Sequence, residues 1–179
     1  MQYRVKGRVK ISRVKLQGYF ELLAWGAFLL PFPCLAQANC PWLNAATAAG
    51  VLGGPVQMAV SDMNKNSGDA TCTFTRTQSP DNLKIRVITM ANPISEFETL
   101  KKSCGPEANH LRAIGNEAIA CAVPAHSGQQ EQKVIGRIRN RAFIITLTGS
   151  TVSNGPDSPP DVWARKTERV AEAVVGILY

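Results

Sequence analysis

The sequence is poor in the side chains that most often carry out catalysis. Histidine occurs only twice, as His110 and His126, and no G-x-S-x-G motif is present to position a nucleophilic serine. Covalent catalysis needs a Ser or Cys near a His that an acid orients, and a helical zinc site needs a spacing such as H-E-x-x-H, which is also missing. We therefore predict no catalytic residue, no metal site and no cofactor.

Acidic residues offer few candidates for acid–base chemistry, because the chain has only 13 Asp and Glu among its 179 residues. Glu96 and Glu98 fall in the expected first turn of a helix, where negative charge interacts favourably with the helix dipole. Glu117 lies next to a turn. An extracellular hydrolase that uses Glu117 with one of the two histidines is an alternative hypothesis.

The chain also lacks a hydrophobic run of the ~20 residues that a transmembrane helix requires. The apolar stretch of residues 22–32 follows a basic segment, residues 1–17, and precedes the triplet Ala-Gln-Ala at residues 36–38. This order is typical of a secretory signal peptide, so we predict export to the periplasm or the extracellular space, with cleavage after Ala38. The export signal is then the chain's only expected contact with a membrane. A domain tethered to the membrane by an uncleaved N-terminus is a second alternative.

The net charge of +7 at pH 7 belongs mainly to this signal. Residues 1–38 hold six basic residues and one acid, which leaves 14 basic and 12 acidic residues, a net charge of +2, in residues 39–179. A strongly basic domain would have suggested nucleic acid as a partner. The smaller charge removes that argument, and we predict no nucleic-acid partner.

The cysteines show a clear pattern. Of the five, Cys34 lies in the predicted signal, and Cys40, Cys72, Cys104 and Cys121 follow it. An even number of cysteines behind a secretory signal predicts disulfides, and the absence of a C-x-x-C pair argues against a metal or redox site. Three pairings are available. We favour Cys40–Cys72 with Cys104–Cys121, because each joins cysteines from the same half of the chain.

Hydrophobic periodicity predicts one α+β domain over residues 39–179, with a mostly antiparallel sheet of about six strands and three helices in the order α-β-β-β-α-β-β-β-α. A capping box formed by Ser95 and Glu98 is expected to begin the second helix. The apolar stripe of the third helix is expected to consist of Trp163, Val170, Val174 and Ile177. The expected helices cover residues 43–54, 95–103 and 158 onward; the expected strands cover residues 56–60, 71–77, 83–90, 118–123, 133–139 and 142–149; polar loops are expected at residues 125–132 and 150–160.

Three arginines gather at the last expected hairpin. Arg137 and Arg139 are predicted to share one strand face, with Arg141 just past the turn, so that together they could bind an anion, a phosphate or an acidic polymer. The simpler interpretation is a solvated hairpin face that protects an edge strand. A nucleic-acid site would need aromatic side chains beside the cations, and the only neighbour, Phe143, is expected in the core.

Several short motifs resemble a family of small secreted bacterial proteins and lipoproteins of unknown function. They are residues 40–43 (CPWL), 45–56 (AATAAGVLGGPV), 72–74 (CTF) and 113–118 (AIGNEA). The chain is also similar to the extracellular sensor domains of some bacterial Ser/Thr kinases and to the PsbP-like α/β/α sandwich. The resemblance supplies no catalytic residues. The signal peptide, the four cysteines and the lack of a catalytic arrangement together predict a secreted or periplasmic, non-catalytic binding domain whose partner is an unknown ligand or an envelope protein.

Overall fold

The computed structural model describes residues 39–123, 129–150 and 160–179. The predicted signal peptide, residues 1–38, lies outside the described residues. So do Cys34, His126 and most of the predicted loop at residues 150–160. Within the described parts, none of the helices combines the length and hydrophobicity needed to cross a membrane.

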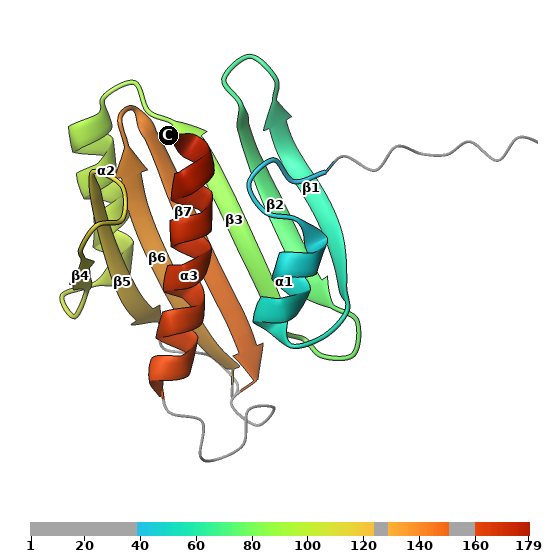
Figure 1. The fold of residues 1–179 in the computed structure, drawn as a ribbon. Helices are drawn as coiled ribbons and strands as arrows, with labels where there is room; N and C mark the ends of the chain where they lie inside the picture. Colours follow the sequence, from blue (N-terminus) through green and yellow to red (C-terminus); the bar gives the residue numbers. More distant parts are fainter. Residues whose placement is uncertain (1–38, 124–128, 151–159) are drawn as a thin grey trace, which may run out of the picture. The chain divides into compact units, whose positions relative to one another are not determined.

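One antiparallel sheet of seven strands forms the centre of the fold, in the spatial order β1-β2-β3-β7-β6-β5-β4 (Figure 1). Sequential strands pair as neighbours, except that β7 inserts beside β3 and joins the two halves of the sheet. The strands are β1 (Val56–Asn64), β2 (Asp69–Arg76), β3 (Asn82–Thr89), β4 (Asn109–Leu111), β5 (Glu117–Val123), β6 (Gln129–Ile138) and β7 (Arg141–Ser150).

Helices lie on both faces of this sheet. The first face carries α1 (Ala45–Leu52) and α3 (Pro160–Leu178), which Figure 1 shows in front of the strands. The second face carries α2 (Pro93–Lys101), which continues into the 3₁₀ helix η1 (Lys102–Cys104). The α+β class and the predicted order of elements are therefore confirmed, with one strand more than expected.

The main core lies between the sheet and the α1–α3 layer. It is built from alternate residues of the strands, because successive side chains of a strand point to opposite faces. Its fully buried members include Phe74, Leu83, Ile85, Phe143 and Ile145. A smaller core lies under α2, where Phe97 packs with Met90, Ile119, Ile135 and Ala142.

Local sequence signals define the first helix as expected. The Asn44 side chain caps its N-terminus by accepting a hydrogen bond from the Thr47 backbone N–H, at 2.7 Å. Gly53 ends it in the left-handed conformation, with φ +74°.

Both favoured disulfides are present. Cys40 is bonded to Cys72 and Cys104 to Cys121, across sequence separations of 32 and 17 residues. The first fastens the segment before α1 to β2, and the second fastens the end of η1 to β5.

The predicted start of the second helix is wrong. α2 begins at Pro93, and Asn92 is its N-cap residue. Proline suits the first helical position because its φ is already helical and its missing N–H is not needed there. The Glu96 side chain accepts a hydrogen bond from the Asn92 backbone N–H at 2.7 Å, whereas Glu98 pairs with Lys101.

Two strand predictions also need correction. Residues 129–132 were expected in a loop but extend β6, because Gln129 through Gln132 pair with the end of β7. Their polar sequence lacks the apolar alternation that marks a strand. The three-residue strand β4, which pairs with β5, has no local signal at all.

Ile177 was expected in the apolar stripe of α3 but is 57% exposed. Trp163, Val170 and Val174 are buried as expected. Thr167 and Ala171 are also fully buried. Because each residue is rotated about 100° from the one before it, these two residues shift the centre of the buried stripe around the helix and away from Ile177.

Candidate functional site

The three arginines predicted to form an anion site point in different directions. β6 ends at Ile138, so Arg139 lies in the two-residue turn, with φ +53°, and not on the strand. Its backbone N–H donates to Asn116 Oδ1 at 2.6 Å. Ile138 pairs with Arg141 across this turn, which puts Arg141 on the α1–α3 face, while Arg137, one position earlier, lies on the α2 face.

Two of these arginines already have partners within the protein. The Arg137 guanidinium carbon lies 5.9 Å from the centre of the Phe97 ring, where a cation is attracted to the π-electrons. Arg141 Nη2 donates to the carbonyl oxygen of Gly68 at 2.7 Å and links this hairpin to the β1–β2 hairpin. The arginines therefore do not converge on one point.

A second charged cluster surrounds Lys101. Its Nζ lies 2.7 Å from Glu117 Oε1 and 2.6 Å from Glu98 Oε1, and 5.4 Å from the centre of the Phe97 ring. Hydrogen bonds to Glu117 first, and to Glu98 second, raise the pKa of Lys101 above its usual value. Glu117 thus fastens the end of α2 to β5.

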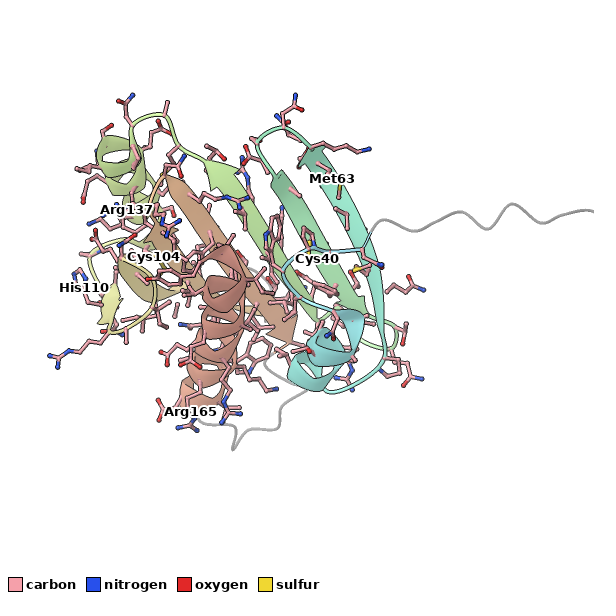
Figure 2. The ribbon with its side chains drawn as sticks, turned by 45° about the horizontal axis from the view of Figure 1, so that its top comes forward. Cys40, Met63, Cys104, His110, Arg137 and Arg165 are labelled. Atoms are coloured by element: carbon pink, nitrogen blue, oxygen red, sulfur yellow. A yellow bond between two sulfur atoms is a disulfide. The ribbon has the colours of Figure 1, made fainter. Side chains whose placement is uncertain are left out.

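Among the described residues, no hydrogen bond or ion pair links His110 to Glu117, the two residues of the hydrolase hypothesis that the structure describes. His110 is an exposed residue of β4 at the outer edge of the sheet (Figure 2), and its register partner is Ile119. Glu117 is held by Lys101 at 2.7 Å. His126 lies outside the described residues.

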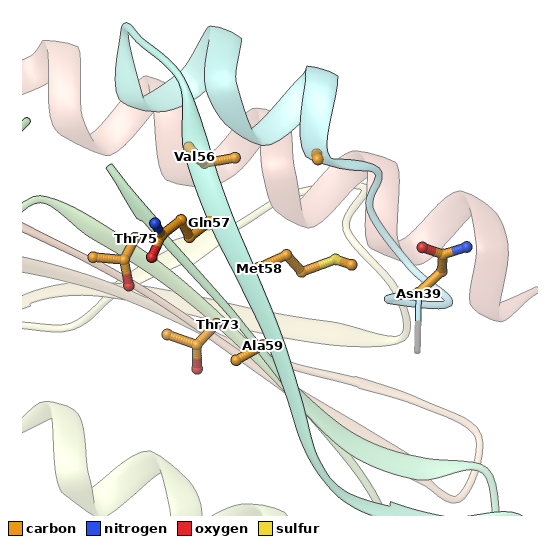
Figure 3. Close-up of a pocket in the computed structure, with 8 residues that line it drawn as sticks. Asn39, Val56, Gln57, Met58, Ala59, Thr73 and Thr75 are labelled. Carbon is orange, nitrogen blue, oxygen red and sulfur yellow. The ribbon is translucent and has the colours of Figure 1, made fainter. Parts of the chain in front are cut away.

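The sheet itself presents a surface that the sequence analysis did not single out. On the second face, α2 packs over β5 and over the ends of β6 and β7 near Ile135 and Ala142, and Ile88 at the end of β3 packs against the same cluster. No described element covers β1, β2, the rest of β3 or the opposite ends of β6 and β7 on this face. Figure 3 shows Thr73 and Thr75 pointing to the opposite side of the sheet from α1 and α3. We call this surface the threonine–lysine face and define it by its outward side chains, Thr73, Thr75, Lys84, Arg86, Lys133, Thr146 and Thr148.

Strand register arranges these side chains in rows across the sheet. One row runs Thr73, Lys84, Thr146, Lys133 through β2, β3, β7 and β6. With about 4.8 Å between strands, the two lysines of the row start roughly 10 Å apart. Lys84 and Arg86 start about 7 Å apart along β3.

The cations of this face differ in how they are paired. Lys84 and Arg86 are exposed, and within the described residues neither takes part in an ion pair or a side-chain hydrogen bond. Lys133 Nζ lies 3.3 Å from Glu131 Oε1. Two charges are therefore free to meet an anion from outside.

A depression of about 700 Å³ borders the same face at the sheet edge. It wraps around β1 and is lined by Gln57 and Ala59 on the side of the threonines, and by Val56 and Met58 on the side of α1 (Figure 3). Because β1 is an edge strand, an extended ligand lying on the face can continue past it into this depression.

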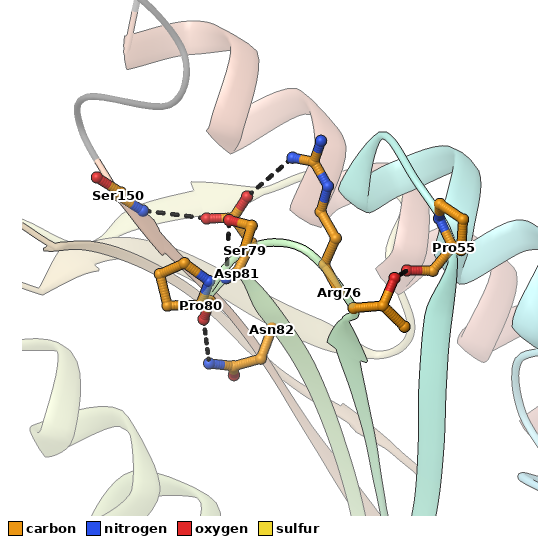
Figure 4. Close-up of polar contacts among 8 residues, drawn as sticks. Pro55, Arg76, Ser79, Pro80, Asp81, Asn82 and Ser150 are labelled. Atoms are coloured by element: carbon orange, nitrogen blue, oxygen red, sulfur yellow. Dashed lines mark hydrogen bonds and ion pairs between the residues drawn. The ribbon is translucent and has the colours of Figure 1, made fainter. Parts of the chain in front are cut away.

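A buried carboxylate holds one end of the face in place. Asp81, only 4% exposed, accepts hydrogen bonds from Arg76 Nη1 at 3.3 Å and from the Ser150 backbone N–H at 3.1 Å (Figure 4). Its own backbone N–H donates to Ser79 Oγ at 3.3 Å. These contacts tie the β2–β3 turn to the end of β7, so the rows of the threonine–lysine face keep their register.

No protein-family model matches the chain, and no curated protein matches it either.

Over residues 39–123, 129–150 and 160–179, no group of three His, Cys, Asp or Glu side chains is arranged to hold a metal ion.

Proposed function

We propose that the protein is an exported, non-catalytic binding domain whose threonine–lysine face holds an acidic polysaccharide. The observation that carries the proposal is the exposure of Lys84 and Arg86, without protein partners among the described residues, on the part of the second sheet face that α2 leaves uncovered. Lys and Arg form strong, charge-assisted hydrogen bonds with carboxylates.

The spacing of the face favours a polymer over a small molecule. Small ligands bind in concave, mostly apolar pockets, whereas this surface is an open sheet with polar outward residues. Its two unpaired cations, Lys84 and Arg86, start about 7 Å apart, so a chain that carries acidic groups at intervals can meet both of them. Several weak contacts along such a chain add up through effective concentration.

The residues between the cations favour a sugar polymer. Threonine hydroxyls both donate and accept hydrogen bonds, as sugar hydroxyls do, and Thr73 and Thr146 flank Lys84 in its row. The outward positions of β1, β2 and β3 hold no aromatic side chain on which a nucleobase would stack.

Export is supported by the two disulfides and by the predicted signal peptide. Disulfides form and persist in oxidising compartments such as the periplasm or the extracellular space. N-terminal sequencing of protein expressed with its signal tests this part. A start at Asn39 supports cleavage after Ala38, and an intact N-terminus on exported protein would support a tethered domain instead.

Binding to polygalacturonate, measured by isothermal titration calorimetry at low salt, tests the ligand class. We expect the double variant Lys84→Gln, Arg86→Gln to weaken the Kd at least tenfold. The double variant Lys102→Gln, Arg165→Gln removes the same charge from exposed sites on η1 and α3 and should change the Kd less than twofold. Figure 2 shows the position of Arg165 on α3.

Two control ligands decide between kinds of partner. Neutral dextran should not bind, and poly-glutamate should bind more weakly than polygalacturonate. Tighter binding of poly-glutamate would overturn the polysaccharide assignment. The proposal also fails if the wild-type protein does not bind polygalacturonate, or if both double variants weaken binding equally.

A further inference from the structure

α1 and α3 lie on the face of the sheet opposite the threonine–lysine face (Figure 1). Residues of both helices line a groove on this side. Its volume is about 390 Å³, which falls within the range of small-molecule sites. The lining combines an apolar floor with two cationic side chains: Gly50, Val51, Val170 and Ala173 with Lys166 and Arg169.

Glycine at position 50 keeps the α1 side of this groove open. Gly50 is an interior residue of α1, where glycine is the least favourable residue apart from proline. A Cβ built at Gly50 would meet no atom within 4 Å, and the residue has no positive φ. Neither packing nor backbone conformation therefore requires a glycine here, whereas a large side chain would project into the groove.

The two cations belong to neighbouring positions of α3. Residues three apart lie on the same side of a helix, so Lys166 and Arg169 repel each other across one turn. No ion pair of the described residues neutralises either of them. Lys166 Nζ lies 6.0 Å from the centre of the Trp163 ring, and Arg169 is exposed.

We infer that this groove binds a free, long-chain carboxylate as a single molecule. The carboxylate would lie between Lys166 and Arg169, where it relieves their repulsion, and the alkyl chain would cover Val51, Val170 and Ala173. The apolar floor complements the alkyl chain of such an amphiphile, and the two neighbouring cations complement its carboxylate. A simple anion would contact only the cations, and a neutral alkane would contact only the floor. This inference is independent of the threonine–lysine face, because the two surfaces lie on opposite sides of the sheet.

Titration with laurate below its micelle concentration, followed by NMR chemical shifts of α1 and α3, tests the inference. We expect Gly50→Leu to weaken laurate binding at least tenfold, because leucine fills the groove. The thermal midpoint of this variant should not fall, since leucine favours the helix and meets no atom at its Cβ. The matched variant Gly50→Ala adds only a methyl group and should change the Kd less than threefold.

The charge requirement is tested separately with Lys166→Gln, Arg169→Gln. This variant should bind laurate about tenfold more weakly and dodecanol as well as the wild-type protein does. Lys84→Gln, Arg86→Gln should bind laurate normally, which keeps a failure of this inference distinct from a failure of the polysaccharide proposal.

Three results would overturn the assignment. The first is no shift of α1 or α3 resonances up to the micelle concentration. The second is laurate binding that Gly50→Leu leaves unchanged. The third is a protein that does not bind monomeric laurate but binds phosphatidylglycerol vesicles, with binding weakened by substitution of Gly50 or Arg169. That result would identify the groove as a membrane contact.

Discussion

The ring of Phe143 on β7 lies directly over the backbone of Gly136, its register partner on β6. A Cβ at Gly136 would overlap the ring atoms of Phe143. Both residues are buried, and Phe143 is fully inaccessible to solvent. Because Gly136 has no side chain, the Phe143 ring can occupy the space that a Cβ at position 136 would take.

Gly136→Ala is expected to destabilise the domain by about 1–3 kcal/mol, the usual cost of inserting extra atoms into a packed core. Urea denaturation measures the change in the free energy of unfolding. Gly50→Ala is the matched control, since a Cβ at Gly50 meets no atom within 4 Å, and it should stabilise the protein by about 1 kcal/mol through helix propensity. Equal stabilities of the two alanine variants would contradict the steric account.

Asp81 should be among the most sensitive polar residues. Asp81→Asn keeps an oxygen for the Ser150 N–H but loses the charge that pairs with Arg76, so we expect a loss of about 1 kcal/mol. Asp81→Ala removes both acceptors and should cost about 2–3 kcal/mol. Thermal denaturation of both, with the exposed Glu107→Ala as control, checks the order. Alanine proving no worse than asparagine would mean that the contact to the end of β7 contributes nothing.

The two disulfides should differ in their contribution to stability. The loop-closure model relates the stabilisation to the length of chain that is enclosed, and gives about 3.7 kcal/mol for a separation of 32 residues and about 3.1 kcal/mol for 17, a difference of roughly 0.6 kcal/mol. Replacing Cys40 and Cys72 by alanine should therefore lower the midpoint of guanidinium denaturation more than replacing Cys104 and Cys121. The reverse order would show that loop entropy does not dominate.

Lys101 should stabilise the folded protein at neutral pH, and this contribution should be lost at alkaline pH. Because its pKa is raised above 10.5 in the folded protein, the contribution is fully present below pH 10.5 and is lost as the pH rises through the higher folded value. Lys101→Met should cost about 1 kcal/mol at pH 8, since Glu98 is half-exposed and its pair is screened.

The difference between Lys101→Met and the wild-type protein should shrink above pH 10.5, in urea denaturation at several pH values. The neighbouring exposed Lys102→Met is the control and should have no such pH dependence. A Lys101→Met effect that stays constant up to pH 12 would rule out the ion pairs as its source.

Much of the fold follows from local rules that the sequence makes visible. The cap at Asn44, the helix end at Gly53 and the pairing of the four cysteines were predictable, because each depends on neighbouring residues or on order along the chain. The hairpins of β2 with β3 and of β6 with β7 follow from alternating side chains around short turns.

Other features depend on partners that are distant in sequence. The three residues of β4 become a strand only because β5 offers them hydrogen bonds, and Gln129 joins β6 only because β7 extends far enough to pair with it. Arg137 and Arg141 are close in sequence but lie on opposite faces, since a two-residue turn at Arg139 sets the register between them.

The candidate binding surface shows the same division. The sequence alone determines that Thr73, Lys84 and Arg86 alternate with core residues and therefore point outward from their strands. Only the tertiary structure decides that this face stays uncovered, because α2 packs around Phe97 over the other half of the sheet. The insertion of β7 beside β3 likewise brings Lys133 into the row of Lys84, since Lys84 pairs with Thr146, 62 residues further along the chain, and no local pattern encodes such long-range pairing.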